Sequence, residues 1–435
     1  MMNTNTTTVN ITEFGAVAGE PAVQTAAIQR AVDHVHSAGG GTVVVPEGVF
    51  ATGGIVLRSN ITLRLMRGAV LAGSRNLLDY MPYDLPKPPE ATRRYDPWCR
   101  WNNAVIKAVD AENIAILGEA GSLIDGSNSI DPIGEQGHRG AHGINLHRCR
   151  NIMLEGYRIA NAGNFSHAVF FCENLAMRKV HVQNGKDGLN VRGTSNIHVS
   201  GCLFETIDDC VAGYGNQNVV IRDSRFTTFS HGIRFSASNM LVEDCHFYGL
   251  DFLPFPGPET MAEREAGIVR EAGTVPCDRM QAMFLNMYNK HLPLPGKAEH
   301  VVFRHCRVEN VKRAVKYHVS ESNDWQSGNP LRDLHFEHVE FSGIEVPLTV
   351  IGTADGPLTL TMENVSFRFR EGFQHQPFLR AGHCKLIRLK NVSLPTATQG
   401  PLIQTWTPAE IELENVTAAV PDDQRVAMTD EPVRA

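Results

Sequence analysis

The chain has 435 residues, of which 42% are hydrophobic and 20% are charged, and its formal net charge is -7. This composition is typical of folded globular proteins and excludes disordered and collagen-like chains. The acidity is mild and no block of basic residues occurs, so nothing in the charge pattern favours binding to nucleic acid, and we expect no such partner.

The first ten residues are polar and rich in Thr and Asn, without the basic and then apolar order of an export signal. No apolar run of the length needed to cross a bilayer, about 18 residues, occurs in the sequence, so we expect no membrane partner. These features predict a cytoplasmic protein. The nine cysteines are scattered singly, without a Cys-x-x-Cys pair. This spacing favours buried free thiols over disulfides or a zinc site.

The first predicted element is an amphipathic helix over residues 21–38, which ends at three consecutive glycines. We expect this helix to cap one end of the fold. Short apolar strands are predicted after it, at 42–46, 53–57 and 61–65. The next stretch, 76–103, is rich in Pro, Tyr and Trp, and we interpret it as a loop insertion.

A phrase that begins with Asn and continues with alternating apolar residues then repeats along the chain. Its clearest copies follow one another at steps of 21 to 23 residues and begin at Asn151, Asn174, Asn196, Asn218 and Asn239. Positions one, three, six and eight after the Asn are mostly apolar, which indicates strands interrupted by one turn. Related copies lie near 113, 301, 334, 359, 386 and 411. Most of the chain is therefore one array.

A repeat of this length cannot bury its own apolar face, but stacked copies bury a continuous column. The predicted fold class is all-β, a single-stranded right-handed parallel β-helix with an N-terminal capping helix. It forms a single domain over 1–435, with the array spanning 42–420. A leucine-rich repeat has a similar period but requires a Leu-x-x-Leu-x-Leu pattern, which this repeat does not show. Each leading Asn is expected to adopt the left-handed backbone conformation and to stack on its copies.

A second long insertion is predicted at 251–297, where the sequence is rich in Pro, Gly and Glu. Long insertions on a solenoid project from one face, where ligands bind, so we expect the insertions at 76–103 and 251–297 to border the functional site. The last residues, 421–435, are polar and are expected to fray.

A second regularity appears when the copies are aligned by their leading Asn. Asp187, Asp209 and His231 each lie thirteen residues after the Asn of three consecutive copies, and Asp208 stands beside Asp209. Equal positions in successive turns of a β-helix lie one above the other, about 4.8 Å apart. We expect these side chains to face one groove, where mutual repulsion drives one carboxyl group towards its protonated form.

A protonated carboxyl group beside an ionised one is what glycoside hydrolysis requires, because one protonates the leaving oxygen and the other activates water. Two other interpretations stay open. Asp and His are common in solvated turns, and grouped carboxylates also bind calcium. The coincidence of three positions favours catalysis, and the neighbouring histidine argues against calcium. No motif indicates a metal, redox or nucleotide cofactor, so we expect none.

These motifs resemble glycoside hydrolase family 28, the polygalacturonase-type glycosidases. The likeness extends from residue 14 to about residue 420. The family motifs Asn-Thr-Asp-Gly, Asp-Asp-Cys and Gly-His-Gly resemble, in this chain, Gly185-Lys186-Asp187-Gly188, Asp208-Asp209-Cys210 and Ser230-His231-Gly232. The resemblance implies an inverting hydrolase in which Asp208 is the general acid. It also implies that Asp187 and Asp209 activate water and that His231 tunes or holds the acid.

The sequence departs from the family where the substrate is held. The family's Arg-x-Lys motif, which grips a uronate carboxylate, corresponds to residues 283–288, which contain no cation. The lysine that usually follows the Asp pair corresponds to Tyr214. Because no neutral group reproduces a bidentate arginine, the contact with galacturonate is missing or rebuilt. Arg234, expected to point outward three residues after His231, is the candidate that rebuilds it.

Further candidates for substrate binding are Lys186, Tyr214, Tyr288 and two tryptophans of the first insertion, Trp98 and Trp101, whose rings are able to stack on a sugar. We predict a pectin-derived oligosaccharide as the substrate. If the two insertions enclose the groove, the site accepts chain ends, which suits an exo-acting enzyme. A cytoplasmic location agrees with this, because such an enzyme meets imported fragments and never the intact polymer.

Two other functions stay open. A polysaccharide lyase on the same fold would use a cationic or tyrosine base near C5 of the sugar, often with calcium, and its product would absorb ultraviolet light. A non-catalytic glycan-binding β-helix would keep its properties when Asp208 is replaced by Asn. The acidic column of Asp187 and Asp209 argues against both.

Overall fold

A computed structural model describes residues 7–80, 95–257, 259–268, 270–277, 279–319, 323–374, 377–394 and 401–429. Most of its regular structure is strand. The chain separates into two compact units, which are 1–208 with 253–275 (unit 1) and 209–252 with 276–435 (unit 2). Within each unit short strands stack in parallel, so the predicted all-β parallel β-helix is confirmed. That the two units form one domain stays a prediction.

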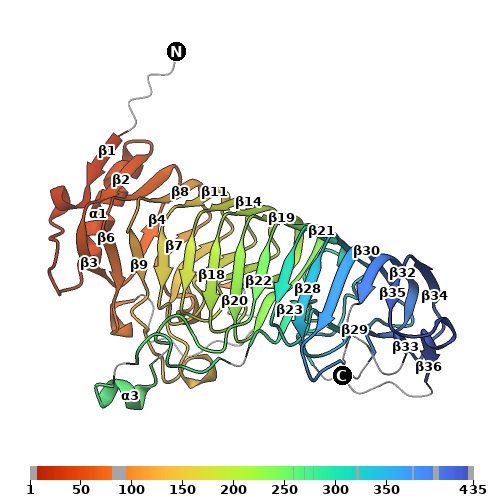
Figure 1. Ribbon diagram of the computed structural model, residues 1–435. Coiled ribbons are helices and arrows are strands. Elements are labelled where there is room, and N and C mark those ends of the chain that lie inside the picture. The colour runs from red at the N-terminus through yellow and green to blue at the C-terminus, as the bar shows by residue number, and fades with distance from the viewer. Residues whose placement is uncertain are drawn as a thin grey trace. The chain divides into compact units, whose positions relative to one another are not determined.

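Unit 1 contains three ladders of parallel strands, which we call the first, second and third faces (Figure 1). The first face consists of β1 (Thr7–Asn10), β2 (Gly41–Val45), β5 (Ile61–Leu65), β8 (Glu112–Gly118), β11 (Arg150–Glu155), β14 (Glu173–Arg178) and β17 (Ser195–Ser200). The second face consists of β3 (Gly48–Thr52), β6 (Ala69–Gly73), β9 (Leu123–Asp125), β12 (Arg158–Ala160), β15 (His181–Gln183) and β18 (Leu203–Thr206). The third face consists of β4 (Ile55–Leu57), β7 (Ala104–Val109), β10 (His142–His147), β13 (His167–Phe170) and β16 (Leu189–Arg192).

Unit 2 repeats the three faces, and several of its strands are long enough to continue from one face to the next. Its first face consists of the later parts of β19 (Val211–Arg222) and β21 (His231–Glu243), with β24 (Glu299–Arg304), β27 (Asp333–Glu337), β30 (Leu358–Phe369), β32 (Cys384–Leu394) and β34 (Glu410–Glu414). Its second face consists of β20 (Arg225–Thr228), β22 (His246–Tyr248), β25 (Arg307–Glu309), β28 (Glu340–Ile344), the ends of β30 and β32, and β35 (Thr417–Ala418). Its third face consists of the starts of β19 and β21, with β23 (Ala282–Leu285), β26 (Val315–His318), β29 (Leu348–Ile351), β31 (Leu379–Gly382), β33 (Ile403–Thr405) and β36 (Val426–Met428).

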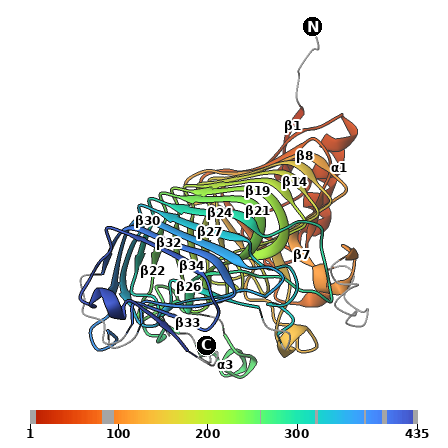
Figure 2. The same cartoon turned by 90° about the vertical axis from the view of Figure 1, so that its right-hand side faces the viewer.

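The apolar positions of the repeat fill the interior of each unit. In unit 1, Ile197, Val199, Cys202 and Phe204 are all buried, as the alternation predicts. In unit 2, β24, β27 and β30 lie side by side in Figure 2, and aromatic side chains continue the column from turn to turn. Burial of each large apolar side chain stabilises the fold by roughly 1.5–3 kcal/mol.

The leading asparagines form the ladder that the sequence predicted. Asn151, Asn174 and Asn196 have φ of 55°, 58° and 57°. The amide of Asn174 donates to Asn151 at 3.0 Å and that of Asn196 to Asn174 at 2.9 Å. In unit 2, Asn239 donates to Asn218 at 3.1 Å in the same way. Asparagine tolerates the left-handed conformation, and its side chain satisfies a neighbour at each step.

The predicted capping helix is present but shorter than 21–38. Helix α1 spans Thr25–Ser37, and its buried residues Ala27, Ile28, Ala31, Val32 and Val35 form the expected apolar stripe against the first strands (Figure 1, red). It begins later because Gln24 bonds Val17 through both its side-chain oxygen and nitrogen, which holds the preceding residues in a loop.

The insertions differ in part from the prediction. Of residues 76–103, those at 81–94 lie outside the described part, and the rest include two short 3-10 helices, Leu77–Asp79 and Arg100–Asn102. The second insertion contains α3 (Met261–Glu265), but β23 (Ala282–Leu285) within it belongs to the third face, so the predicted bounds 251–297 are too wide. The sequence of β23 is entirely apolar and lacks the leading Asn that identifies the clearest copies of the repeat.

The C-terminal segment is more ordered than the sequence suggested. We predicted a fraying tail over 421–435, but β36 pairs in parallel with β33, so the prediction is wrong for this strand. Residues 430–435 lie outside the described residues. Backbone pairing with a strand of the preceding turn orders this short segment of an otherwise polar tail.

Two further expectations bear on the class of protein. None of the described helices is long and apolar enough to cross a membrane. All nine cysteines, each of them described, are free thiols, and eight are buried, which confirms the prediction of buried free thiols.

Candidate active site

The predicted catalytic residues lie where the chain passes from the second face to the third. In unit 1, Asp187 lies between β15 and β16, and Asp208 follows β18. In unit 2, Asp209 precedes β19, and His231 begins β21. The register pairs Val211 with Ile233, so Asp209 and His231, each two residues earlier, hold the same position in successive turns. The predicted stacking of these two side chains is confirmed.

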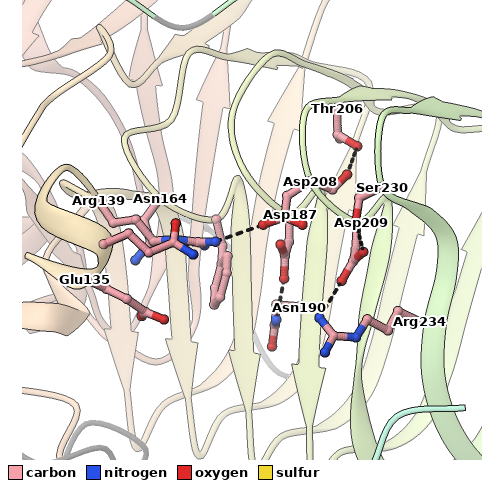
Figure 3. A network of polar contacts seen from close by, with 12 residues as sticks. Glu135, Arg139, Asn164, Asp187, Asn190, Thr206, Asp208, Asp209, Ser230 and Arg234 are labelled. Carbon is pink, nitrogen blue, oxygen red and sulfur yellow. Dashed lines mark hydrogen bonds and ion pairs between the residues drawn. The ribbon is translucent and has the colours of Figure 1, made fainter. Parts of the chain in front are cut away.

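Asp208 carries a partly exposed carboxylate that an arginine orients. Arg139 Nη2 donates to Asp208 Oδ2 at 2.8 Å (Figure 3). The side chain of Asp208 is 30% exposed, whereas that of Arg139 is 7% exposed. Thr206 Oγ1 donates to the backbone oxygen of Asp208 at 2.7 Å and fixes the turn. The carboxyl group is thus oriented by Arg139 and remains accessible to a ligand.

Arg139 is itself held in place by two amide side chains. Its Nη1 donates to Asn164 Oδ1 at 3.2 Å, and its Nε donates to Gln136 Oε1 at 3.1 Å. Burial disfavours the charged guanidinium, but the nearby Asp187 and Asp208 outweigh burial and raise the pKa of Arg139 above its usual value. The group is therefore a fixed cation beside Asp208.

Asp187 is buried and is oriented from the third face. Asn190 Nδ2 donates to Asp187 Oδ2 at 2.6 Å (Figure 3), and Arg192 Nε donates to Asn190 Oδ1 at 2.9 Å. The guanidinium of Arg192 lies 5.2 Å from the centre of the Phe170 ring. This relay of donors keeps one oxygen of Asp187 in a defined direction.

Lys186, a predicted binding residue, lines a pocket of unit 1. Burial, followed by repulsion from Arg139, lowers the pKa of Lys186 below its usual value. Burial also lowers the pKa of His138, with repulsion from Lys186 as the second cause. The pocket is lined by Asn128, Ser129, Ile130, Gly137, His138, Ala162, Gly163, Gly185, Lys186, Ile207, Glu259, Thr260 and Met261. An anionic ligand group would relieve the repulsion between Lys186 and Arg139.

In unit 2, three side chains surround the buried carboxylate of Asp209. Ser230 Oγ donates to Asp209 Oδ1 at 2.7 Å, and His231 Nδ1 lies 2.8 Å from the same oxygen. Arg234 Nη1 donates to Asp209 Oδ2 at 3.4 Å, and the contacts of Ser230 and Arg234 are drawn in Figure 3. The side chain of Asp209 is only 2% exposed, so these partners replace water around it.

These contacts decide the ionisation of Asp209. Burial raises its pKa, but the charge and hydrogen bond of His231, then the charge of Arg234, outweigh burial and hold the pKa of Asp209 well below its usual range. We had expected repulsion to drive one of the carboxyl groups towards its protonated form. For Asp209 the shift is in the opposite direction, because His231 and Arg234 stabilise its charge, and it is an ionised carboxylate.

Comparison with known proteins places this geometry in context. A family model described as a right-handed β-helix region matches residues 102–269. An exo-poly-α-D-galacturonosidase of Dickeya chrysanthemi is 27% identical, with the match covering 49% of this chain and 44% of the relative. The chain thus spans less than half of that curated relative.

Two solved structures share the fold. The exopolygalacturonase of Thermotoga maritima has a TM-score of 0.66 at 17% identity, and the match covers 89% of this chain and 91% of that one. The family 28 exopolygalacturonase of Yersinia enterocolitica has a TM-score of 0.52 at 17% identity, covering 98% of this chain and 79% of that one. The chain is a right-handed parallel β-helix like those of glycoside hydrolase family 28.

Arg234 has the outward orientation predicted for it, and its contact with a substrate stays a prediction. It lies on β21 between the buried Ile233 and Phe235, and its side chain is 23% exposed, so it points outward as predicted. Its guanidinium, however, contacts Asp209. The main contact of Arg234 is therefore with Asp209, and part of its side chain remains exposed to solvent.

The structure does not support a binding role for Tyr214. This side chain is fully buried, and its hydroxyl donates to the backbone oxygen of Leu292 at 2.9 Å. Tyr288, another candidate, packs against Tyr214 with ring centres 5.6 Å apart and donates its hydroxyl to the oxygen of Leu294 at 3.3 Å. Both residues support the loop that follows β23, and the burial of Tyr214 argues against its direct contact with a ligand.

The two tryptophans of the first insertion have different surroundings. Trp98 is 45% exposed, and Lys107 Nζ lies 5.1 Å from the centre of its ring. Trp101 is half-buried, with its ring centre 4.8 Å from that of His142 and 5.6 Å from that of Phe165. Only Trp98 has a face open enough for sugar stacking, and Trp101 is a packing residue on the third face.

Several residues of the site were not found from the sequence. Asn190 carried a signal, since a polar residue between Leu189 and Val191 marks an outward position on the third face. Ser230 carried one too, because it directly precedes His231. Arg139 carried none, since it lies in the loop before β10, outside the repeat.

Proposed function

We propose that the protein is a glycoside hydrolase that cleaves a pectin-derived oligosaccharide containing galacturonic acid or a related sugar. The observation that carries the proposal is the contrast between two consecutive residues. Asp208 is partly exposed and oriented by Arg139, whereas Asp209 is buried and held ionised by His231 and Arg234. Glycoside hydrolysis requires two carboxyl groups in unlike environments.

The proposed mechanism is a single displacement that inverts the anomeric carbon. Asp208 gives its proton to the glycosidic oxygen as the bond from the anomeric carbon to that oxygen breaks. A water molecule forms the new bond to the anomeric carbon, and its proton passes to Asp187 or Asp209. The contacts of Asn190 and Ser230 with these carboxylates support the assignment, since they hold the accepting oxygens in place.

An exo mode of action is also part of the proposal. Trp101 lies over the third face of unit 1, near His142 of β10 and with its ring centre 6.4 Å from that of Phe170 of β13. Its indole nitrogen donates to Glu135 Oε2 at 2.9 Å, which fixes the ring. A sugar chain cannot lie on the part of this face that the ring occupies, which favours recognition of a chain end. The named relative from Dickeya chrysanthemi is an exo-acting enzyme.

A β-helix lyase is the alternative, and the site favours it less. A lyase needs a base that removes the proton at C5, together with cations or calcium that neutralise the uronate. Asp209 accepts hydrogen bonds from Ser230 and Arg234, and His231 Nδ1 lies 2.8 Å from it, so a nitrogen group and a cation stand where calcium prefers oxygen ligands. Tyr214, the tyrosine nearest in sequence, is buried.

A product assay tests the proposal. Purified protein is incubated with acidic and neutral oligosaccharides, and reducing ends, ultraviolet absorbance and anomeric NMR signals are followed together. New reducing ends of inverted configuration without absorbance are expected. An absorbing product would establish the lyase, and a retained configuration would overturn the inverting mechanism. Binding without any product, unchanged by Asp208→Asn, would identify a non-catalytic glycan-binding protein.

A further inference from the structure

The third face of unit 2 carries a column of outward residues in register. Arg234 of β21 pairs with Leu285 of β23, and Leu285 pairs with Lys316 of β26. Lys316 pairs with Thr349 of β29, which pairs with Arg380 of β31. Cations therefore recur at every second turn. Since parallel strands lie about 4.8 Å apart, the backbone positions of successive cations are roughly 10 Å apart.

The side chains of this column point away from the interior. Lys316 lies between the buried Val315 and Tyr317, and Arg380 lies between the buried Leu379 and Ala381. Both cations are half-buried. Alternation along a strand sends such residues to the outer surface of the third face.

A further cation, Arg313, stands in the turn that leads into β26. It is half-buried, and its backbone forms an isolated parallel β-bridge with Val346, the corresponding residue before β29. We call Arg313, Lys316 and Arg380 the cationic strip. Arg313 is close enough to interact electrostatically with both Lys316 and Arg380. Burial lowers the pKa of Lys316, and repulsion from Arg313 and Arg234 lowers it further. Burial lowers the pKa of Arg313, with repulsion from Arg380 as the second cause.

No acidic side chain neutralises the strip within the described part of unit 2. Arg234 forms an ion pair with Asp209 there, and Glu345 forms ion pairs with both Arg279 and Arg370. None of the ion pairs in the described part of unit 2 involves the three cations of the strip. The Nε atom of Arg380 is buried without a hydrogen-bond partner among the described residues. The whole chain has a net charge of -7, so this group of cations is a local exception. The cations repel one another, and an anionic ligand would remove this unfavourable repulsion.

We propose that the cationic strip binds the carboxylates of an anionic oligosaccharide, so that the substrate extends over several turns of the third face of unit 2. The proposal deepens the proposed function and rests on it for the identity of the sugar. Two arginines and a lysine provide directional and point-like contacts for carboxylates. The spacing of the strip selects a glycan with acidic groups on more than one sugar. The residues at 283–288, where the family grip was expected, contain no cation, and Leu285 stands one turn before Lys316.

The test is a binding measurement on the full chain carrying Asp208→Asn, so that the ligand stays intact. Galacturonic acid oligomers of one to five sugars are titrated by calorimetry into this parent, and into the same protein with Lys316→Gln or Arg380→Gln. Lys385→Gln, which changes an exposed lysine at the start of β32, is the matched control. A fully methyl-esterified pentamer and a sulfated oligosaccharide of equal length serve as ligand controls.

Affinity of the parent is expected to rise with oligomer length. Each strip variant is expected to weaken binding of the pentamer roughly tenfold, as a charged hydrogen bond is worth, while leaving the single sugar and the Lys385→Gln control unchanged. The methyl-esterified pentamer is expected to bind as weakly to the parent as the charged pentamer does to the variants. Circular dichroism melting verifies that each variant is folded.

Two results would overturn the strip. One is binding of the pentamer that is unchanged in both strip variants, and the other is tighter, strip-dependent binding of the sulfated ligand, which would contradict a carboxylate site. Hydrolysis by the unmodified protein is measured separately. Product release with strip-independent binding rejects the strip and leaves the hydrolase standing. Strip-dependent binding without product release rejects the hydrolase and supports the strip.

Discussion

His231 Nδ1 lies 2.8 Å from Asp209 Oδ1, the same oxygen that accepts the hydroxyl of Ser230 at 2.7 Å. Because the other oxygen of Asp209 faces Arg234, both oxygens of this buried carboxylate are held by donors. An acid that must carry a proton would lose these contacts. The relationship therefore keeps Asp209 ionised and leaves proton donation to Asp208.

The stability of the protein should depend on pH through Asp209. The pKa of this residue is lowered in the folded state, so its contribution is fully present above the pKa of an unfolded aspartate, about 3.9, and is lost as the pH falls below it. Asp209→Asn should therefore be less stable than the unmodified protein at pH 7. Urea unfolding should show this difference shrinking between about pH 5 and pH 2, and a constant difference would contradict the assignment.

Replacement of Asp208 by Asn should abolish catalysis without unfolding the chain. We expect the rate to fall at least roughly 100-fold because the proton donor is lost, while the melting temperature changes little because the side chain is partly exposed. Asp110→Asn is the matched control, since Asp110 also accepts from an arginine, Arg148. Equal activity of the two variants would show that Asp208 is not the acid.

Arg139→Lys should separate charge from geometry. Lysine keeps the positive charge but cannot reproduce the three directed contacts with Asp208, Asn164 and Gln136. We expect kcat/KM to fall roughly tenfold to 100-fold through misplacement of the acid. Steady-state kinetics checks this. Full activity of Arg139→Lys would mean that charge alone suffices.

Trp101→Ala should change where the substrate is cut. Removal of the ring opens the third face of unit 1 above His142 and Phe165, so that a longer chain is able to bind across it. Chromatography of products from a long oligogalacturonate should then show internal fragments in place of one end product. An unchanged product pattern would mean that another group blocks the groove.

Val199→Asp should unfold unit 1. Val199 is fully buried on β17, and an unpaired carboxylate there costs several kcal/mol. Val49→Asp, at a position of β3 that is 47% exposed, should leave the melting curve nearly unchanged. Soluble expression and circular dichroism of the two variants provide the comparison.

The features that could be predicted from the sequence are those that recur in each turn of the repeat. The leading asparagines and the apolar alternation recur in every clear copy, so one copy explains the others, and Asp209 and His231 followed from the same register. The features that could not be predicted depend on single contacts outside the repeat. Arg139 comes from a loop with no repeat, and its role depends on Asn164 and Asp208, which are far from it in sequence. Strand β36 is only 3 residues long and lies within an otherwise polar tail, so no repeat pattern marks its pairing with β33.

The second insertion has a consequence for how the stack assembles. Contacts between successive turns of unit 2 normally join residues that are close in sequence; for example, Asn239 bonds to Asn218, 21 residues before it. Across the insertion, Arg304 meets Glu243 with a separation of 61. Closing the longer loop costs about 1 kcal/mol more in chain entropy. A stack that grows one turn at a time should therefore slow between β21 and β24, and the halves on either side should be the intermediates that accumulate during refolding.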